Sequence, residues 1–518
     1  MRLRAAIVGP SRPWEELLTQ EGFPWDVVDV RRTPLAGEYS VAIVHRSLDP
    51  EEREVLAAYM RSGGAVLGDA AHSTGFCSTS ARADYLEYVV GDGVFADVHL
   101  CALGMRGAIS KEAAYGRTQT GFHAIFAGEM CGGLAVLLPF SVPLAMADER
   151  PAVTSFYARH ERLPSERVSA VAKGEVRHLV RASLEFLHVE RGLPYVHLWY
   201  YPEGSTNVFG FRVDTDGASR GETDELYRIA HNSGVRMSWF LDLRACEPRL
   251  EQFRAMVGQE IGLHCYEHRE PAGEGALRAD MEKGLRILQA AGFHPEGFAA
   301  PYGFWKPFVS SLPRALGLHY SSEFSFAYDT TPLAPTGLSG VHGVLQIPIH
   351  PICPGSLRRA GFSSSAMIDY YRYVVAQKRG RQEPLIFYHH PSHRMPEVIE
   401  MVCAEAKVSG TRTMTLGEYA AWWERRSPIS LRMETEGDEL RLDPADVLRC
   451  AEGDVAVRVA RRGRKECIIP PAGRASLSLL PWRDRESVIA PEDIRRTRAF
   501  DLQRLLGTMH HTIIRRTR

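Results

Sequence analysis

Carboxylates and imidazoles are concentrated in three short segments of this sequence. FRVDTDG contains Asp214 and Asp216, EIGLHCYEHRE contains His264 and His268, and LIFYHHPSHR is the third segment. Burying two carboxylates unpaired is costly, and binding one to a cation while the other stays a base resolves their repulsion. Histidines four residues apart converge on one ion where a strand end turns into a helical loop, and imidazole suits zinc and its neighbours. We therefore predict a divalent metal site with a carboxylate base beside it.

The third segment supplies candidates for a general acid: His389, His390 and His393. Each segment by itself is more often structural, since the chain has 20 histidines and aspartates beside glycine are common in turns. The functional interpretation rests on their combination, because all three follow predicted strands. Alternation along the first strand also places Arg212 on the same face as both aspartates.

The elements that must position these residues alternate between strand and helix over residues 195–427. Strands are predicted at 208–213, 236–241, 260–263, 297–300, 345–349, 385–388 and 412–414, with helices near 222–232, 248–257, 276–290 and 415–424. This alternation predicts a distorted (β/α) barrel, complete or incomplete. The chemistry of such a fold lies at the carboxyl ends of its strands.

Residues 1–194 predict a separate α/β domain. Apolar strands are expected at 4–8, 25–30, 39–45, 65–67 and 133–139, with a closing helix over 177–186. Short strands separated by helices indicate a doubly wound parallel sheet.

The end of the chain has a different character. Residues 428–490 contain short alternating segments separated by turn residues, which predicts a small all-β, sandwich-like module. We expect it to act as a structural cap, with carbohydrate binding as the alternative. Residues 491–518 form a basic tail, expected to be solvated or bound to a partner.

Composition narrows the class of protein. The 518 residues include 62 Lys and Arg against 63 Asp and Glu, so the net charge of −1 gives no reason to expect nucleic acid. No apolar run reaches membrane-spanning length, and the N-terminus lacks the apolar core of a signal peptide. Nine scattered cysteines without a CxxC pair fit a reducing compartment. We expect a cytoplasmic, multidomain protein without a disulfide framework or a cysteine zinc site.

The stretch from residue 209 to about residue 423 resembles the polysaccharide deacetylases, the family that includes chitooligosaccharide and peptidoglycan deacetylases. FRVDTDG is similar to its Asp motif, in which the first Asp is the base and the second a metal ligand. HCYEH is similar to its second motif, whose two histidines bind the metal. The resemblance implies that Asp214 is the base and that the site binds one divalent ion. Zinc is the favoured ion, and nickel, cobalt and iron are the alternatives. Its implied ligands are Asp216, His264 and His268.

Three further segments look like later motifs of that family. FAAPYG is similar to its Arg-x-Pro-Tyr element and implies that the Tyr302 N–H stabilises an oxyanion. YSSEFS resembles the stretch that gives the catalytic histidine an acidic partner, here Glu323. IFYHHP resembles the last, apolar-x-His motif: its His-Pro pair favours His390 as the acid, and the spacing from Phe387 favours His389. Of these two histidines, we favour His390 as the acid.

The match has departures. The Asp motif is Asp-Thr-Asp rather than Asp-Asp, and Ala299 stands where the third motif usually has an arginine that pairs with the base. Arg212 and Lys306 are candidates to replace that arginine. As substrate contacts we expect Trp305, Tyr266 and Arg212, although aromatic residues here are equally typical of ordinary packing.

The N-terminal region distantly resembles a class I glutamine amidotransferase or a flavodoxin-type sheet. Cys77 in GFCST and Cys131 in EMCGG both lack the glycines of a Gly-x-Cys-x-Gly nucleophile turn, and a Gly-rich phosphate loop is missing. We therefore expect a non-catalytic region without glutaminase activity. Its expected roles are interaction, oligomerisation or substrate gating.

The leading functional hypothesis is a metal-dependent hydrolase that removes an N-acetyl group from an acetylated amino sugar or glycan precursor. One alternative is a non-catalytic glycan-binding protein that retains the fold, suggested by Ala299. The other is an amidase that acts on a non-sugar amide or cyclic imide, a reaction that some relatives perform.

Overall fold

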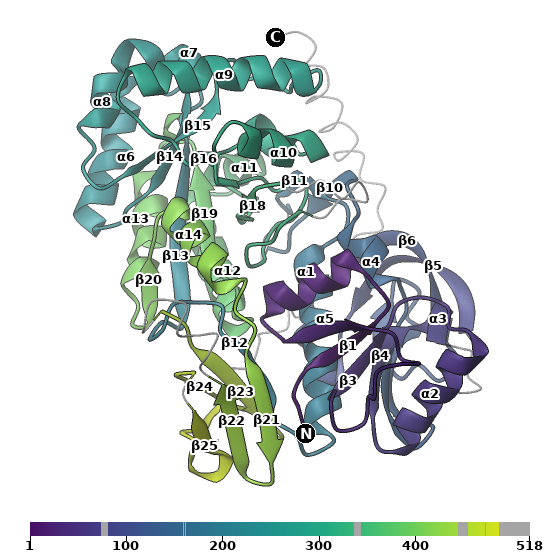
Figure 1. Ribbon diagram of the computed structural model, residues 1–518. Coiled ribbons are helices and arrows are strands. Elements are labelled where there is room, and N and C mark those ends of the chain that lie inside the picture. The colour runs from purple at the N-terminus through teal and green to yellow at the C-terminus, as the bar shows by residue number, and fades with distance from the viewer. Residues whose placement is uncertain are drawn as a thin grey trace.

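The computed structural model describes residues 1–73, 81–158, 160, 162–335, 343–443, 454–471 and 473–485. Two large sheets, both flanked by helices, make up most of this part of the chain, with three smaller sheets beside them (Figure 1). The predicted basic tail, residues 491–518, lies outside the described residues. No helix in the described part of the chain has both the length and the apolar character needed to cross a bilayer.

The N-terminal sheet has nine strands in the order β2-β1-β3-β4-β9-β8-β7-β5-β6. Their bounds are β1 (Ala5–Val8), β2 (Trp25–Val28), β3 (Val41–Val44), β4 (Ala65–Asp69), β5 (Ala81–Val90), β6 (Cys101–Ser110), β7 (Tyr115–Thr118), β8 (His123–Met130) and β9 (Gly133–Leu138). Strands β2, β1, β3, β4 and β9 pair in parallel. The short apolar runs of β1, β3 and β4 are fully buried, as expected for strands covered on both faces.

Helices cover both faces of this parallel part. On one face Ile7 of β1 packs in one cluster with Leu17 of α1 (Arg12–Glu21) and Leu179 of α5 (Lys173–Val189). On the other face Val8 packs with Leu56 of α2 (Pro50–Arg61). The doubly wound arrangement predicted from the sequence is thereby confirmed. The antiparallel strands β5 to β8 extend the sheet beyond that prediction.

The second large sheet is parallel throughout, in the order β18-β17-β16-β15-β14-β13-β19, with β20 also on β13. Its strands are β13 (Asn207–Asp214), β14 (Ser238–Asp242), β15 (Glu260–Cys265), β16 (Gly297–Phe298), β17 (Tyr320–Ser321), β18 (Leu345–Gln346), β19 (Leu385–His389) and β20 (Thr411–Thr413). Strands β18 and β19 end the series without pairing to each other, so the sheet is a partial (β/α) barrel. This confirms the predicted fold class.

Helices follow most strands of the barrel. They are α6 (Arg220–Ser233), α7 (Leu243–Cys246), α8 (Leu250–Arg254), α9 (Glu274–Ala290), α10 (Pro307–Ala315), α11 (Pro354–Arg359), α12 (Ser364–Gly380), α13 (Pro396–Ala404) and α14 (Leu416–Arg426). Helix α6 begins with a capping box between Ser219 and Glu222, and it ends at Gly234, whose φ of 68° suits glycine. The capping box therefore fixes the residue at which the loop that carries Asp216 ends and α6 begins.

The small sheets join distant parts of the chain. Strand β12 (Tyr195–Leu198) lies just before the barrel, yet it pairs antiparallel with β23 (Val457–Arg461). That sheet continues through β24 (Lys465–Ile469) and β26 (Arg483–Asp484), while β21 (Arg432–Glu436), β22 (Glu439–Asp443) and β25 (Arg474–Ser476) form another. The C-terminal strands therefore do not form one self-contained module. The hairpin of β10 (Pro151–Ser155) and β11 (Ser165–Ser169) is the remaining sheet.

Helix α5 connects the two large sheets through buried polar contacts. Arg177 Nη1 lies 3.1 Å from Glu21 Oε2 of α1, and Arg177 Nε donates to Thr330 Oγ1 in the barrel region. His178 Nε2 lies 2.6 Å from Glu383 Oε1, just before β19. Because unpaired buried charges are costly, these pairs favour one arrangement of the two sheets.

Candidate metal centre

The carboxyl ends of β13, β15 and β19 bring the three chemical segments together. Asp214 is the last residue of β13, His264 lies in β15, and His390 follows β19 directly. In a parallel sheet these ends lie at one edge, where barrel enzymes place their reactive groups.

Asp216, His264 and His268 form a compact group of ligand atoms within 4.8 Å of one another. Asp216 Oδ1 lies 3.0 Å from His264 Nε2, and Asp216 Oδ2 lies 2.8 Å from His268 Nε2. Both Nε2 atoms and Oδ1 are nevertheless buried without a hydrogen bond of acceptable geometry. Atoms that converge in this way without bonding one another suit a shared cation, and one carboxylate with two imidazoles is a zinc-type donor set.

Backbone groups orient both histidines. His264 Nδ1 lies 2.6 Å from the Ala299 carbonyl oxygen, which fixes the proton on Nδ1 and leaves Nε2 free to bind a metal. The loop that carries His268 is held by Asp280, whose carboxylate oxygens each accept an N–H at 2.8 Å, from Tyr266 and Glu267. Ala299 thus serves the site through its carbonyl group.

Asp214 is held by Arg212 in a buried, bidentate ion pair. Arg212 Nε donates to Oδ1 at 2.7 Å and Nη2 donates to Oδ2 at 2.6 Å, and Arg212 Nη1 also donates to the Ser322 carbonyl oxygen. Burial would raise the pKa of Asp214, but the Arg212 guanidinium, helped by His264, lowers it below the usual value. Asp214 therefore stays ionised, as a base requires.

Arg212, one of the two residues expected to take the place of the motif arginine, thus contacts Asp214. Lys306 is exposed at the start of α10, whereas the Arg212 side chain is 1 % exposed and contacts the carboxylate. The expectation that Arg212 contacts substrate is therefore corrected: its guanidinium is enclosed behind Asp214.

The two adjacent histidines face different surroundings, because side chains alternate along β19. His390 Nε2 lies 3.5 Å from Asp216 Oδ2 and 4.0 Å from Asp214 Oδ2. His389 is buried and lines a small cavity with Glu222 and Ile229 on the side of α6 and α13. Only His390 of this pair reaches the aspartates.

The electrostatic surroundings of His390 favour its protonated form. Burial lowers the pKa of His390, but Cys353 and the two aspartates outweigh this effect and raise it to about 9. Burial lowers the pKa of His389 well below its usual value.

The aromatic residues predicted to lie at the site differ in exposure to solvent. Tyr302 has a left-handed backbone with φ of 59°, its side chain is 40 % exposed, and its ring lies edge-on to His268 with centroids 4.7 Å apart. Trp305 is only 4 % exposed and packs on Phe326 at 4.2 Å, so it presents no open face for a sugar, contrary to expectation. The Tyr266 ring is covered on one face by Lys283 Nζ at 3.4 Å.

Glu323 is fully buried next to the site, but its side-chain partner is Ser321, whose Oγ donates at 2.8 Å. Burial is the main effect on its pKa, which rises to about 8. No contact between Glu323 and His390 occurs among the residues described above. The acidic partner role therefore has no geometric support.

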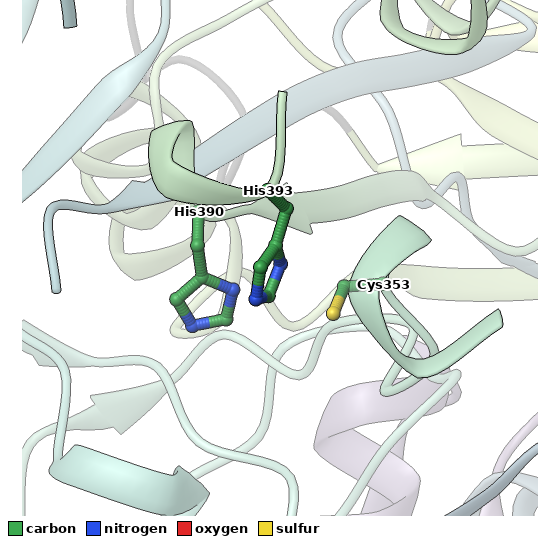
Figure 2. A group of neighbouring side chains, drawn as sticks. All are labelled: Cys353, His390 and His393. Atoms are coloured by element: carbon green, nitrogen blue, oxygen red, sulfur yellow. The ribbon is translucent and has the colours of Figure 1, made fainter. Parts of the chain in front are cut away.

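Cys353 and His393 lie beside His390, and the proximity of Cys353 was not expected from the sequence. Ligand atoms of the three side chains lie within 4.8 Å of one another (Figure 2). Burial would raise the pKa of Cys353, but hydrogen bonding to His390 and His393 lowers it well below its usual value. No local pattern links Cys353 to a histidine so far along the chain.

The β10–β11 hairpin, which precedes the barrel, contacts the loop after His268. Arg167 Nη1 of β11 lies 2.9 Å from Glu270 Oε1, and the Arg167 carbonyl oxygen accepts from Ser325 Oγ at 3.5 Å. A strand of the N-terminal region therefore contacts the loop that follows the candidate ligand His268.

The cysteines differ from expectation at one position. Cys131 is disulfide-bonded, although we expected reduced thiols throughout. Cys77 lies outside the described residues. Six cysteines are free and buried: Cys101, Cys246, Cys265, Cys353, Cys403 and Cys467.

Comparison with known proteins gives structural matches only. No protein-family model matches the sequence, and neither does any curated protein. A Mycobacterium smegmatis protein assigned as a polysaccharide deacetylase aligns at 20% identity over 46% of this chain and 96% of its own, with a TM-score of 0.37.

Two other solved structures align with similar extents. PuuE allantoinase matches at 16% identity over 43% of this chain and 92% of its own, with a TM-score of 0.35. The Bacillus anthracis protein BA3943, described as a CE4 family pseudoenzyme, matches at 16% identity over 42% of this chain and 68% of its own, with a TM-score of 0.31. Part of this chain is thus similar in structure to these proteins.

Proposed function

We propose that the protein is a metal-dependent hydrolase that removes an N-acetyl group from an acetylated amino sugar or glycan precursor. The observation that carries the proposal is the buried Asp214 carboxylate, held by two hydrogen bonds from Arg212 beside Asp216, His264 and His268. A carboxylate kept ionised next to a cation site is suited to take a proton from water.

In this proposal Asp216, His264 and His268 hold one divalent ion, zinc first, which would lower the pKa of water and polarise the acyl oxygen. Asp214 accepts the proton of the attacking water through Oδ1 or Oδ2. The Tyr302 N–H donates to the developing oxyanion. His390, protonated on Nε2, gives its proton to the departing amine, which otherwise leaves poorly.

The remaining regions have supporting roles in this proposal. The N-terminal region is non-catalytic and shapes access to the site through the β10–β11 hairpin and its contact with Glu270. The C-terminal strands act as a cap, since β12 and β23 tie them to the start of the barrel region.

The test compares wild type with Asp214→Asn. If Asp214 is the base, the variant keeps its metal, measured by elemental analysis, and acetate release from N-acetylated amino sugars falls roughly 10²-fold or more. Wild type that binds glycans but releases no acetate would indicate the non-catalytic alternative. Hydrolysis of simple amides or cyclic imides alone would indicate the amidase alternative.

A further inference from the structure

A second group of ligand atoms lies next to the candidate metal centre. Cys353 immediately precedes α11, His390 follows β19, and His393 ends the short helical turn η4 (Pro391–His393). Figure 2 shows the three side chains facing one another, and their ligand atoms lie within 4.8 Å. Cys353 is 1 % exposed, so the group is shielded from solvent on its side.

Within the described residues, the histidine Nδ1 atoms of this group have no hydrogen-bond partner outside it. Nδ1 of His390 and Nδ1 of His393 are both buried, and the Cys353 sulfur, which interacts with both histidines, has a further long contact of 3.6 Å to Ser356 Oγ. Buried polar atoms are normally paired, because leaving one unpaired costs about 1–3 kcal/mol. A bound cation would satisfy all three side chains together.

The backbone is shaped to admit the His393 ring. A Cβ atom at Gly355 would lie 2.2 Å from that ring, so only glycine leaves room for it there. The ring is thus packed against the same turn that carries Cys353.

We propose that Cys353, His390 and His393 bind a second transition-metal ion. A thiolate with two imidazoles favours Zn²⁺, Co²⁺ or Cu⁺ and disfavours Mg²⁺ and Ca²⁺, which prefer oxygen. In the thiolate–imidazolium form of the group, binding breaks the N–H bond at His390 Nδ1, forms metal–nitrogen and metal–sulfur bonds and releases one proton to solvent. Water fills the fourth position of a tetrahedral ion.

His390 connects the two groups. Its Nε2 lies 3.5 Å from Asp216 Oδ2, while Figure 2 shows its other ring nitrogen, Nδ1, on the side of Cys353 and His393. An ion on Nδ1 leaves a single proton on Nε2, and losing that proton would form an imidazolate. His390 would then be a poor acid, so the second ion inhibits hydrolysis. This inhibition rests on the proposed function, whereas the binding of the ion does not.

Cobalt binding to the full-length, chelator-treated protein tests the site without any activity measurement. Wild type should bind two equivalents of Co²⁺, and the second should produce the near-ultraviolet charge-transfer band of thiolate–Co²⁺ ligation. Cys353→Ser and His393→Ala should lose this band and keep the first equivalent. Cys403→Ser, which removes another buried free thiol, is the matched control and should keep the band.

The outcomes separate this proposal from the proposed function. His264→Ala with His268→Ala should abolish the first equivalent and keep the thiolate band. Wild type that binds cobalt without a thiolate band would overturn the second site and indicate a thiolate–imidazolium pair instead; this measurement needs no variant to fold. A band that persists in Cys353→Ser would also overturn it.

An activity measurement then tests inhibition. Excess Zn²⁺ should reduce wild-type acetate release by roughly 10²-fold, the scale of losing a general acid. The ratio of activities without and with excess Zn²⁺ should approach one in Cys353→Ser. An equal ratio in both proteins would refute the inhibitory role, whereas the spectra would still report on binding.

Discussion

Arg212 and Asp214 form a bidentate ion pair within one strand, with N–O distances of 2.7 and 2.6 Å and both side chains almost fully buried. The pair places a guanidinium from β13 next to the carboxylate at the end of the same strand. It also explains why Asp214 tolerates burial in an ionised form.

Arg212→Met should therefore leave Asp214 buried without its partner. We expect the free energy of unfolding to fall by about 3–5 kcal/mol, the usual cost of breaking a buried pair. Urea unfolding measures this, with Arg236→Met as the control, because Arg236 and Glu418 form an ion pair at the surface. A control loss of about 1 kcal/mol or less is expected. Equal losses in the two variants would contradict the role of the pair.

Removing the metal should destabilise the wild-type protein. A ligand that binds only the folded state at 100 times its Kd stabilises it by about 2.7 kcal/mol, so chelation should lower Tm. His264→Ala with His268→Ala should remove most of the response to the ion of the first site. His231→Ala changes an exposed histidine on α6 and should respond as wild type does. The ligand assignment fails if the double variant keeps its full metal content.

The adjacent histidines should respond differently to substitution. His390→Gln should reduce kcat roughly 10²-fold, because a neutral amide cannot donate the proton that the leaving amine needs. His389→Gln changes a side chain that faces α6 and α13, so its main effect should be on the free energy of unfolding. Steady-state kinetics combined with urea unfolding separates the two effects. The reverse pattern would assign the acid to His389.

Glu323 should make stability depend on pH. Burial raises its folded-state pKa from 4.5 to about 8, so its stabilising contribution is complete below pH 4.5 and is lost as the pH rises toward 8. Glu323→Gln has no carboxyl group to take up a proton in this pH range. Between these limits the unfolding free energy of wild type relative to Glu323→Gln should fall by roughly 1.4 kcal/mol per pH unit. Parallel stability curves for the two proteins would show that Glu323 is ionised in the folded state.

The main elements of the barrel were predictable because their signals are local. The apolar runs before Asp214, His264 and His389 end at β13, β15 and β19, within a few residues of the predicted bounds. The antiparallel strands β5 to β8 were missed, since β5 has only two buried residues among half-buried and exposed ones and lacks a continuous apolar run. The two-residue strand β17 has too few residues to show a pattern.

By itself, the sequence determined the parallel sheets and the grouping of Asp214, Asp216, His264 and His268, because residue type and strand alternation act over short distances. Tertiary structure alone decided that Arg212 pairs with Asp214, that Trp305 is buried and that Cys353 meets His390. It also paired β12 with β23. These outcomes depend on packing and burial between segments distant in the chain, and such contacts leave no local pattern in the sequence.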